Sequence, residues 1–216
     1  LNNTSDNVIQ TTGTGGITIG SVLTGASKNL AITSSGTGVV TLSGVNTYSG
    51  VTKVNAGELR LNPSANTSLS GAFTFNGGTL ATTGITATRA ITFASVNVSD
   101  NSILALASAV AHTLTFTALG TLTSGKMLTI TGWSGASYAT GTTSGTGGKV
   151  FIGSSASLTT AQLAQIRFYN GTNYYAATQL STGEIVPTTV LVVTNPGTQT
   201  AGVGFSVTVT AKDLDG

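Results

Sequence analysis

Short stretches that alternate apolar and polar residues recur along almost the whole chain, with Gly- or Asn-containing turns between them. In residues 58–61, the two leucines lie on one side of an extended backbone and the two charged residues on the other. Strands spaced by roughly ten residues, with turn signals between them, indicate a β protein. Similar stretches are Leu30–Ile32, Val40–Leu42, Phe73–Phe75, Ile91–Phe93, Val96–Val98, Leu114–Phe116, Leu128–Ile130 and Val150–Ile152.

The composition favours strands and excludes several other classes of protein. Of 216 residues, 42 are Thr and 23 are Ser, and only 6% are charged; an average soluble domain has about a quarter of its residues charged. Threonine favours strands, whereas the residues that favour helices do not dominate. The absence of Cys excludes a disulfide scaffold, a Cys-ligated zinc site and a thiol enzyme.

The same composition limits the partners of the chain. Lys and Arg total 8 and form no cluster, so we expect no binding to nucleic acid, which needs a basic stripe. No apolar run approaches the ~18 residues of a membrane-spanning helix, so we expect no transmembrane segment. The chain begins at Leu1 rather than Met, and we expect it to be a piece of a longer protein.

Two all-β architectures fit the spacing of the strands: an antiparallel sheet or sandwich, and a solenoid. The strands are very short, and Ala56-Gly57-Glu58-Leu59 is echoed by Gly77-Gly78-Thr79-Leu80. The outward positions are mostly Thr and Ser, which can form ladders between coils. These features favour a β-solenoid over residues 1–187, with parallel rungs around a continuous aliphatic core.

Two segments depart from this pattern. Leu158–Ile166 reads as a short helix, with Thr159 as the N-cap and Gln162 completing a capping box. After Pro187, a β-branched strand at 189–193 is followed by a turn and an alternating strand at 205–210. We therefore predict a boundary at 187–189, with a second domain in residues 189–216.

Residues 38–61 contain a characteristic set of positions: Leu42, Ser43, Gly44, Asn46, Thr47, Tyr48, Gly50, Thr52, Val54, Asn55, Gly57 and Leu59. At these positions the segment closely resembles the autotransporter-associated β-strand repeat of bacterial surface and secreted proteins. The region from about 71 to 187 looks like the segment that often follows such repeats. Residues 189–216 resemble the first strands of a bacterial Ig-like domain.

The resemblance implies a right-handed parallel β-helix of the passenger type, followed by an incomplete Ig-like β-sandwich. Such passengers are exported by Gram-negative bacteria to the outer cell surface or the medium, where they serve as stalks, adhesins or surface-layer material. The partners expected for such a protein are surface glycans, or proteins on the surface of a host or neighbouring cell.

No pattern of catalytic residues stands out. His112 is the single His and could join Asp6 or Asp100 in a triad, but no Ser lies in a Gly-x-Ser-x-Gly elbow, so we expect His112 to face solvent before a strand. Glycosidases need two paired acids, and only Asp213 and Asp215 are close in sequence. We expect no enzyme, cofactor or metal; a carbohydrate-binding or polysaccharide-degrading β-helix is the alternative.

Three weaker patterns point to binding rather than catalysis. Residues 213–216 resemble half of a calcium loop, although an Ig-type turn explains them better. Thr-x-Thr pairs at 113–117, 121–123 and 129–131 suggest an ice-binding ladder, but their spacing is irregular. Five aromatic residues, expected at the surface, are candidates for stacking on sugar rings or for capping the solenoid. They are Trp133, Tyr138, Tyr169, Tyr174 and Tyr175.

Overall fold

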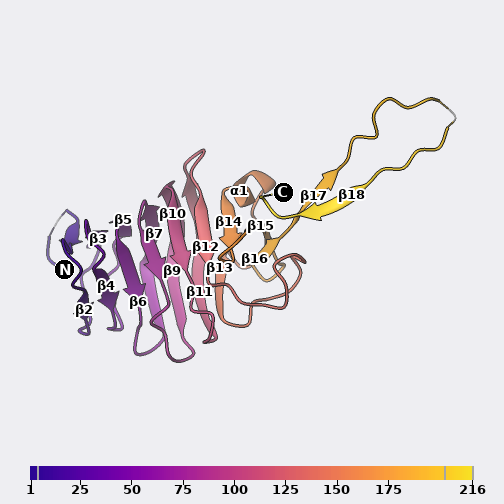
Figure 1. Ribbon diagram of the computed structural model, residues 1–216. Coiled ribbons are helices and arrows are strands. Elements are labelled where there is room, and N and C mark those ends of the chain that lie inside the picture. Colours follow the sequence, from indigo (N-terminus) through magenta and orange to yellow (C-terminus); the bar gives the residue numbers. More distant parts are fainter. Residues whose placement is uncertain (4, 202, 216) are drawn as a thin grey trace.

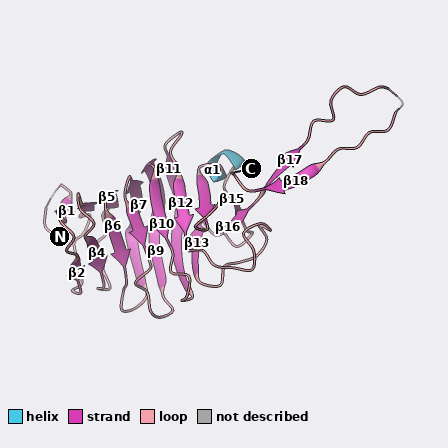
Figure 2. Ribbon diagram, in the orientation of Figure 1, coloured by secondary structure: helices cyan, strands magenta, loops and turns pink. Residues whose placement is uncertain are grey.

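The computed structural model describes residues 1–3, 5–201 and 203–215, and its regular secondary structure is almost entirely strands (Figures 1 and 2). A single sheet of 16 strands winds into a β-solenoid. The odd-numbered strands from β1 to β13 lie on one side and the even-numbered strands from β2 to β14 on the other, and β15 and β16 join the two sides at one end. A separate sheet of 2 strands extends away from one end (Figure 1). The prediction of an all-β solenoid is therefore confirmed.

Each turn of the solenoid contributes one strand to each side. The odd side consists of β1 (Asn7–Ile9), β3 (Leu30–Thr33), β5 (Thr52–Ala56), β7 (Thr67–Asn76), β9 (Ala90–Asp100), β11 (His112–Leu122) and β13 (Gly148–Ile152). The even side consists of β2 (Ile17–Ile19), β4 (Val39–Leu42), β6 (Glu58–Leu61), β8 (Thr79–Ala81), β10 (Ser102–Ala105), β12 (Leu128–Thr131) and β14 (Ile166–Tyr169).

Parallel pairing brings apolar side chains of successive turns into register. On the even side, Leu59 is paired with Leu80, and Leu80 with Leu104. All three are fully buried, and burying each contributes roughly 1.5–3 kcal/mol. The buried part of this column is Val40, Leu59, Leu80, Leu104, Ile130 and Phe168. The alternation seen in the sequence therefore correctly identifies the inward face.

Phenylalanines fill the middle of the solenoid, where β7, β9 and β11 are longest. Phe73 lies 4.7 Å from Phe75 and 5.1 Å from Phe93, measured between ring centroids, in edge-to-face contacts. Phe93 and Phe116 are stacked at 5.9 Å. All four rings are fully buried. Aromatic pairs of this geometry contribute about 0.5–1.5 kcal/mol beyond the area that they bury.

Polar side chains link the corners of adjacent turns. The Asn76 side-chain amide donates to the Asn55 Oδ1 at 2.9 Å, and the Asn55 amide donates to the Thr33 hydroxyl at 3.1 Å. Buried Asn46 accepts the backbone N–H of Leu23 at 2.8 Å. These bonds satisfy polar groups that the turns remove from water.

Parallel stacking stops before the end of the predicted solenoid. β15 (Tyr174–Gln179) and β16 (Glu184–Thr188) run antiparallel to their neighbours and join β14 to β13, which closes the sheet at this end. The expectation of parallel rungs throughout residues 1–187 is therefore wrong for this last segment. The antiparallel strands occupy the hydrogen-bonding edges that the last parallel rungs would otherwise expose.

The short helix α1 covers Thr160–Leu163, less than the predicted 158–166. The capping box between Thr159 and Gln162 is present, as predicted. Ile166 instead begins β14, paired with Leu128, because a buried position in the sheet outweighs weak local helix propensity. Among the described residues, no helix is long and apolar enough to cross a membrane.

The C-terminal segment forms an antiparallel ribbon of β17 (Val190–Val193) and β18 (Val209–Lys212). All residues of both strands are exposed, and Figure 1 shows the ribbon projecting from the capped end. The second predicted strand is displaced: it covers 209–212 rather than 205–210. No second sheet packs on the ribbon within the described residues, so an Ig-like sandwich is not formed by them.

Close stacking of turns leaves no room for a side chain at several glycines, of which Gly71 is the most tightly enclosed. A Cβ on Gly71 would overlap the carbonyl oxygen of Gly50 in the preceding turn, whereas a Cβ on Gly20 would meet nothing within 4 Å. We expect Gly71→Ala to lower the free energy of unfolding by about 1–3 kcal/mol, because the backbones of the two turns must separate. Gly20→Ala, the matched control, should change it by less than about 1 kcal/mol. Urea denaturation measures both, and equal effects would contradict the close contact.

Candidate functional site

The five candidate aromatic residues fall into two separate groups. Trp133, Tyr138 and Tyr175 form one cluster, with centroid distances of 4.9 Å between the first two and 5.1 Å between the last two. Tyr169 and Tyr174 form the other, 4.6 Å apart. Trp133 is only 3% exposed, so the expectation that it lies at the surface is wrong. It packs against Phe168 in the core at 6.2 Å.

A buried carboxylate lies beside Trp133. Glu184 is 1% exposed; it accepts the Ser144 hydroxyl at 2.6 Å and the Gly145 backbone N–H at 2.8 Å. These two bonds attach the loop between β12 and β13 to β16. The indole N–H of Trp133 is buried without a hydrogen-bond partner among the described residues. Glu184 therefore holds the loop between β12 and β13 in place.

The other carboxylates lie in different parts of the fold, and most have partners. Glu58 forms an ion pair with Arg60 at 2.7 Å. Asp100 forms one with Lys126 at 2.6 Å, and this hydrogen bond lowers the pKa of Asp100. Asp6 accepts the side-chain amide of Asn29 at 3.0 Å. None of these acids faces another in the manner of a glycosidase pair.

Asp213 and Asp215 contact the turn between β14 and β15. Asp213 accepts the side-chain amide of Asn173 at 2.5 Å, and Asp215 accepts the backbone N–H of Tyr174 at 2.7 Å. Both carboxylates thereby attach the C-terminal segment to the cap, the antiparallel strands β15 and β16 that close the sheet. Gly216, the last residue of the suggested calcium loop, lies outside the described residues. Among those described, no group of three or more potential ligands could hold a metal ion.

His112 is buried at 2% exposure, and the expectation that it faces solvent is wrong. Its Nδ1 lies 2.8 Å from the carbonyl of Val110, and its Nε2 lies 2.8 Å from the hydroxyl of Thr82. The carbonyl can only accept, so Nδ1 carries the proton and Nε2 accepts from Thr82. Neither Asp6 nor Asp100 bonds to the ring. Burial lowers the pKa of His112, an effect that the bond to Val110 partly offsets.

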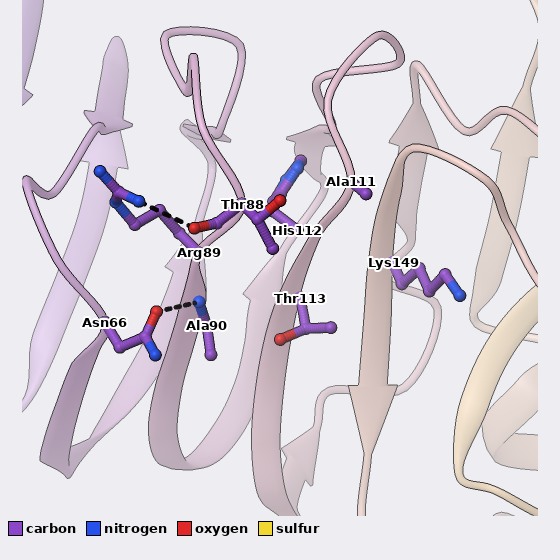
Figure 3. A pocket seen from close by; sticks show the side chains of 8 residues that line it. All are labelled: Asn66, Thr88, Arg89, Ala90, Ala111, His112, Thr113 and Lys149. Carbon is purple, nitrogen blue, oxygen red and sulfur yellow. Dashed lines mark hydrogen bonds between the residues drawn. The ribbon is translucent and has the colours of Figure 1, made fainter.

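A shallow groove of about 330 Å³ lies outside His112, on the odd side (Figure 3). Two cations line it, but Arg89 donates to the carbonyls of Pro63 and Thr88, at 3.1 and 2.8 Å. Figure 3 shows Arg89 and Lys149 at opposite ends, with side chains pointing away from each other. The polar groups in this groove maintain the loop and do not converge on a common point.

A larger groove, of about 510 Å³, crosses the outer face of β8, β10, β12 and β14. Its floor contains Ile103 and Thr129, which are partners in adjacent strands, and Arg167, the partner of Thr129 in β14. Tyr169 and Tyr174 line one end. This groove combines an aromatic pair, a cation and hydroxyl groups, and it is the best candidate site among the described residues.

Sequence reasoning identified the two tyrosines but missed the other residues of this groove. Arg167 lies immediately before Phe168 of the inward column, and Thr79, Ile103 and Thr129 hold the same position in their strands. The sequence therefore contained a signal for the floor of the groove, because each of its residues directly precedes a residue of the buried column. The Thr-x-Thr pairs form no uniform plane, because Thr113 is paired with Lys149 and Thr129 with Arg167.

Comparison with known proteins gives one match to a family. The passenger-associated-transport-repeat family matches residues 32–61, which run from the last residues of β3 through β6. No curated protein and no solved structure matches the chain. The chain therefore contains a passenger-associated repeat within a β-solenoid.

Tyr48, within the matched segment, is a buried residue whose hydroxyl has a single partner. It is 1% exposed, and its hydroxyl lies 2.6 Å from that of Thr52, which is also 1% exposed. Burial raises the pKa of Tyr48 to about 12, although the bond to Thr52 acts in the opposite direction. The pair places two hydroxyl groups inside the core, where each has the other as its hydrogen-bond partner.

Removing one hydroxyl of this pair should destabilise the solenoid more than removing both. We expect Tyr48→Phe to cost about 1–3 kcal/mol, because the buried Thr52 hydroxyl loses its partner. The double variant Tyr48→Phe/Thr52→Val should recover part of that loss. Urea denaturation of the single and double variants measures the coupling. Strict additivity of the two substitutions would contradict the bond.

His112 should make the fold sensitive to mild acid. Its pKa is lowered in the folded protein, so below the unfolded value of about 6.5 the unfolded chain binds a proton more readily. The free energy of unfolding should therefore fall as the pH drops below that value and be unaffected by this group above it. In His112→Gln, the decrease between pH 7.5 and 5.5 should be smaller than in the wild type. An identical decrease in both proteins would show that His112 does not contribute.

Proposed function

We propose that this chain is a passenger-type segment that a Gram-negative bacterium exports to its outer surface or secretes, and that it acts as a rigid, non-catalytic spacer or adhesin stalk. The observation that carries the proposal is the passenger-associated repeat at residues 32–61, which runs from the end of β3 through β6 in two successive turns of the solenoid. Residues from 189 onward would begin an Ig-like domain that extends the stalk.

The physical properties of the solenoid support a structural role outside the cell. Backbone pairing between successive turns forms one sheet of 16 strands, and the core continues from turn to turn. The chain has no Cys, so its stability does not depend on the redox conditions of a compartment. Its outer face presents mainly hydroxyl groups and few charges.

The exposed ribbon supports the proposed Ig-like extension. Leu191 and Val193 are 71% and 61% exposed, although β-branched and aliphatic residues normally pack in a strand. Two-stranded ribbons without a packing partner are marginally stable in water. In the proposed domain, further strands would cover this ribbon.

Surface exposure is tested with an epitope tag inserted between Ser155 and Ala156, which are both exposed. We expect antibody to label intact cells of the source bacterium, or to find the tag in the medium, while a periplasmic marker remains inaccessible. Detection of the tag only after lysis would contradict the proposal. Release of reducing ends from a panel of polysaccharides by the purified chain would contradict the non-catalytic role.

A further inference from the structure

The groove on the even side is a straight track that crosses several turns of the solenoid. Its floor follows the row Thr79, Ile103, Thr129 and Arg167, whose members are register partners in neighbouring strands. Adjacent strands lie about 4.8 Å apart, so the row presents one outward side chain per strand at a regular interval. Ile103 is 41% exposed and forms an apolar platform in the middle of the row.

Arg167 supplies a fixed positive charge at one end of the track. Its Nε donates to the Thr129 hydroxyl at 3.0 Å, and its guanidinium carbon lies 4.2 Å from the centroid of the Tyr174 ring. The terminal Nη groups form no hydrogen bond to the described residues. No Asp or Glu is among the residues that line the groove. A planar guanidinium held in this way is suited to a carboxylate, which it can bind through two parallel bonds.

The charged residues beyond the two ends of this row do not line the groove. Glu58 is the register partner of Thr79 in the preceding strand, and its charge is balanced by Arg60 at 2.7 Å. At the other end, Asp215 accepts the backbone N–H of Tyr174 and does not line the groove. Arg167 is therefore the only charged side chain that lines the groove among the described residues.

Two tyrosine rings form the wall beside Arg167. Tyr169 and Tyr174 lie 4.6 Å apart at an interplanar angle of 31°, and the Tyr169 hydroxyl donates to the Gly171 carbonyl at 2.8 Å. Both residues are half-buried, so the rings are held in place but remain accessible. Fixed aromatic faces beside polar groups are suited to rings that carry both C–H and hydroxyl groups.

We propose that this groove binds an acidic oligosaccharide of the uronic-acid type. The carboxylate of one sugar pairs with Arg167, a sugar ring packs against Tyr169 and Tyr174, and the hydroxyls of Thr129 and Thr131 bind those of the sugar. The inference goes beyond the proposed function, because binding is a property of the isolated chain and does not depend on export.

Features of the groove favour a sugar over a peptide or a nucleic acid. β8, β10, β12 and β14 are each paired on both sides, so an extended peptide finds no free backbone edge to join. A single lining cation cannot follow a phosphate backbone. The exposed hydroxyls and aromatic rings remain as the recognition elements, and they complement a polyhydroxylated ring.

The test is calorimetric titration of the purified chain with a short oligogalacturonate and with the same oligomer fully methyl-esterified. We expect the acid form to bind with a dissociation constant on the order of 1 mM or below, and the ester to bind at least about tenfold more weakly, because it lacks the charge. Binding of the acid form should weaken as salt is raised.

Substitutions in the groove test which residues bind the oligosaccharide. Arg167→Gln should weaken binding of the acid form by about tenfold or more, with little effect on the ester. Tyr174→Ala should weaken both ligands, whereas Tyr174→Phe, which keeps the ring, should bind as the wild type does. Arg89→Gln, in the groove of the odd side, is the matched control and should change nothing. Circular dichroism of each variant verifies that the solenoid is folded.

Several outcomes would overturn the proposal. The first is no detectable binding of oligogalacturonate by the wild type at a ligand concentration about tenfold above the expected dissociation constant. The second is equal binding of the acid and the ester. The third is an effect of Arg89→Gln equal to that of Arg167→Gln. Equal affinity for tetraglutamate would replace the sugar with an acidic peptide. None of these results bears on whether the chain is exported.

Discussion

The structure depends on hydrogen bonding between successive parallel rungs that are kept in register by buried side-chain columns. A parallel strand buries its side chains only if the next turn presents its apolar residues at the same level. Leu59, Leu80 and Leu104 do so on one side, and Leu69, Phe93 and Phe116 on the other. This arrangement fixes the opposite set of residues as well. The outward side chains of successive strands must also lie in rows, and the candidate binding groove is one of these rows.

A stack of rungs has two ends, and the capped end combines several features of the molecule. The antiparallel strands β15 and β16 close the sheet, and Glu184 attaches the preceding loop to them. Asp213 and Asp215 connect the C-terminal ribbon to the same cap through Asn173 and Tyr174. Tyr174 belongs to this connection and also to the wall of the groove. The proposed glycan site and the start of the proposed Ig-like domain are therefore neighbours.

Local pattern determined much of the fold but not the partners of each strand. Alternation identified Leu59 and Leu61 as inward, and the capping box at Thr159 was readable within four residues. Parallel and antiparallel pairing impose the same alternation on a strand, so the reversal at β15 left no mark in the sequence pattern. Ile166 fitted a helical face equally well, and only its pairing with Leu128, 38 positions earlier, places it in a strand.

The candidate site was predicted less well, because its residues are brought together from distant turns. His112 is buried through Thr82, which is 30 residues away, and the burial of Trp133 depends on Phe168 and Tyr138. The sequence shows where the aromatic residues are, but it does not show which of them the solenoid buries. The role proposed for Arg167 depends on Thr129 and Tyr174, which only the folded chain brings beside it.

Disulfide formation between introduced cysteines tests the register between successive turns most directly, since the chain has no Cys of its own. Ser68 and Thr92 are register partners in β7 and β9, and Cα atoms about 4.8 Å apart are within bridging range. The double variant Ser68→Cys/Thr92→Cys should oxidise rapidly to a cross-linked monomer, and Ser68→Cys/Ala94→Cys, which is two positions out of register, should do so much more slowly. Cross-linking that is equally fast in both, or absent from the first, would contradict the stacked solenoid.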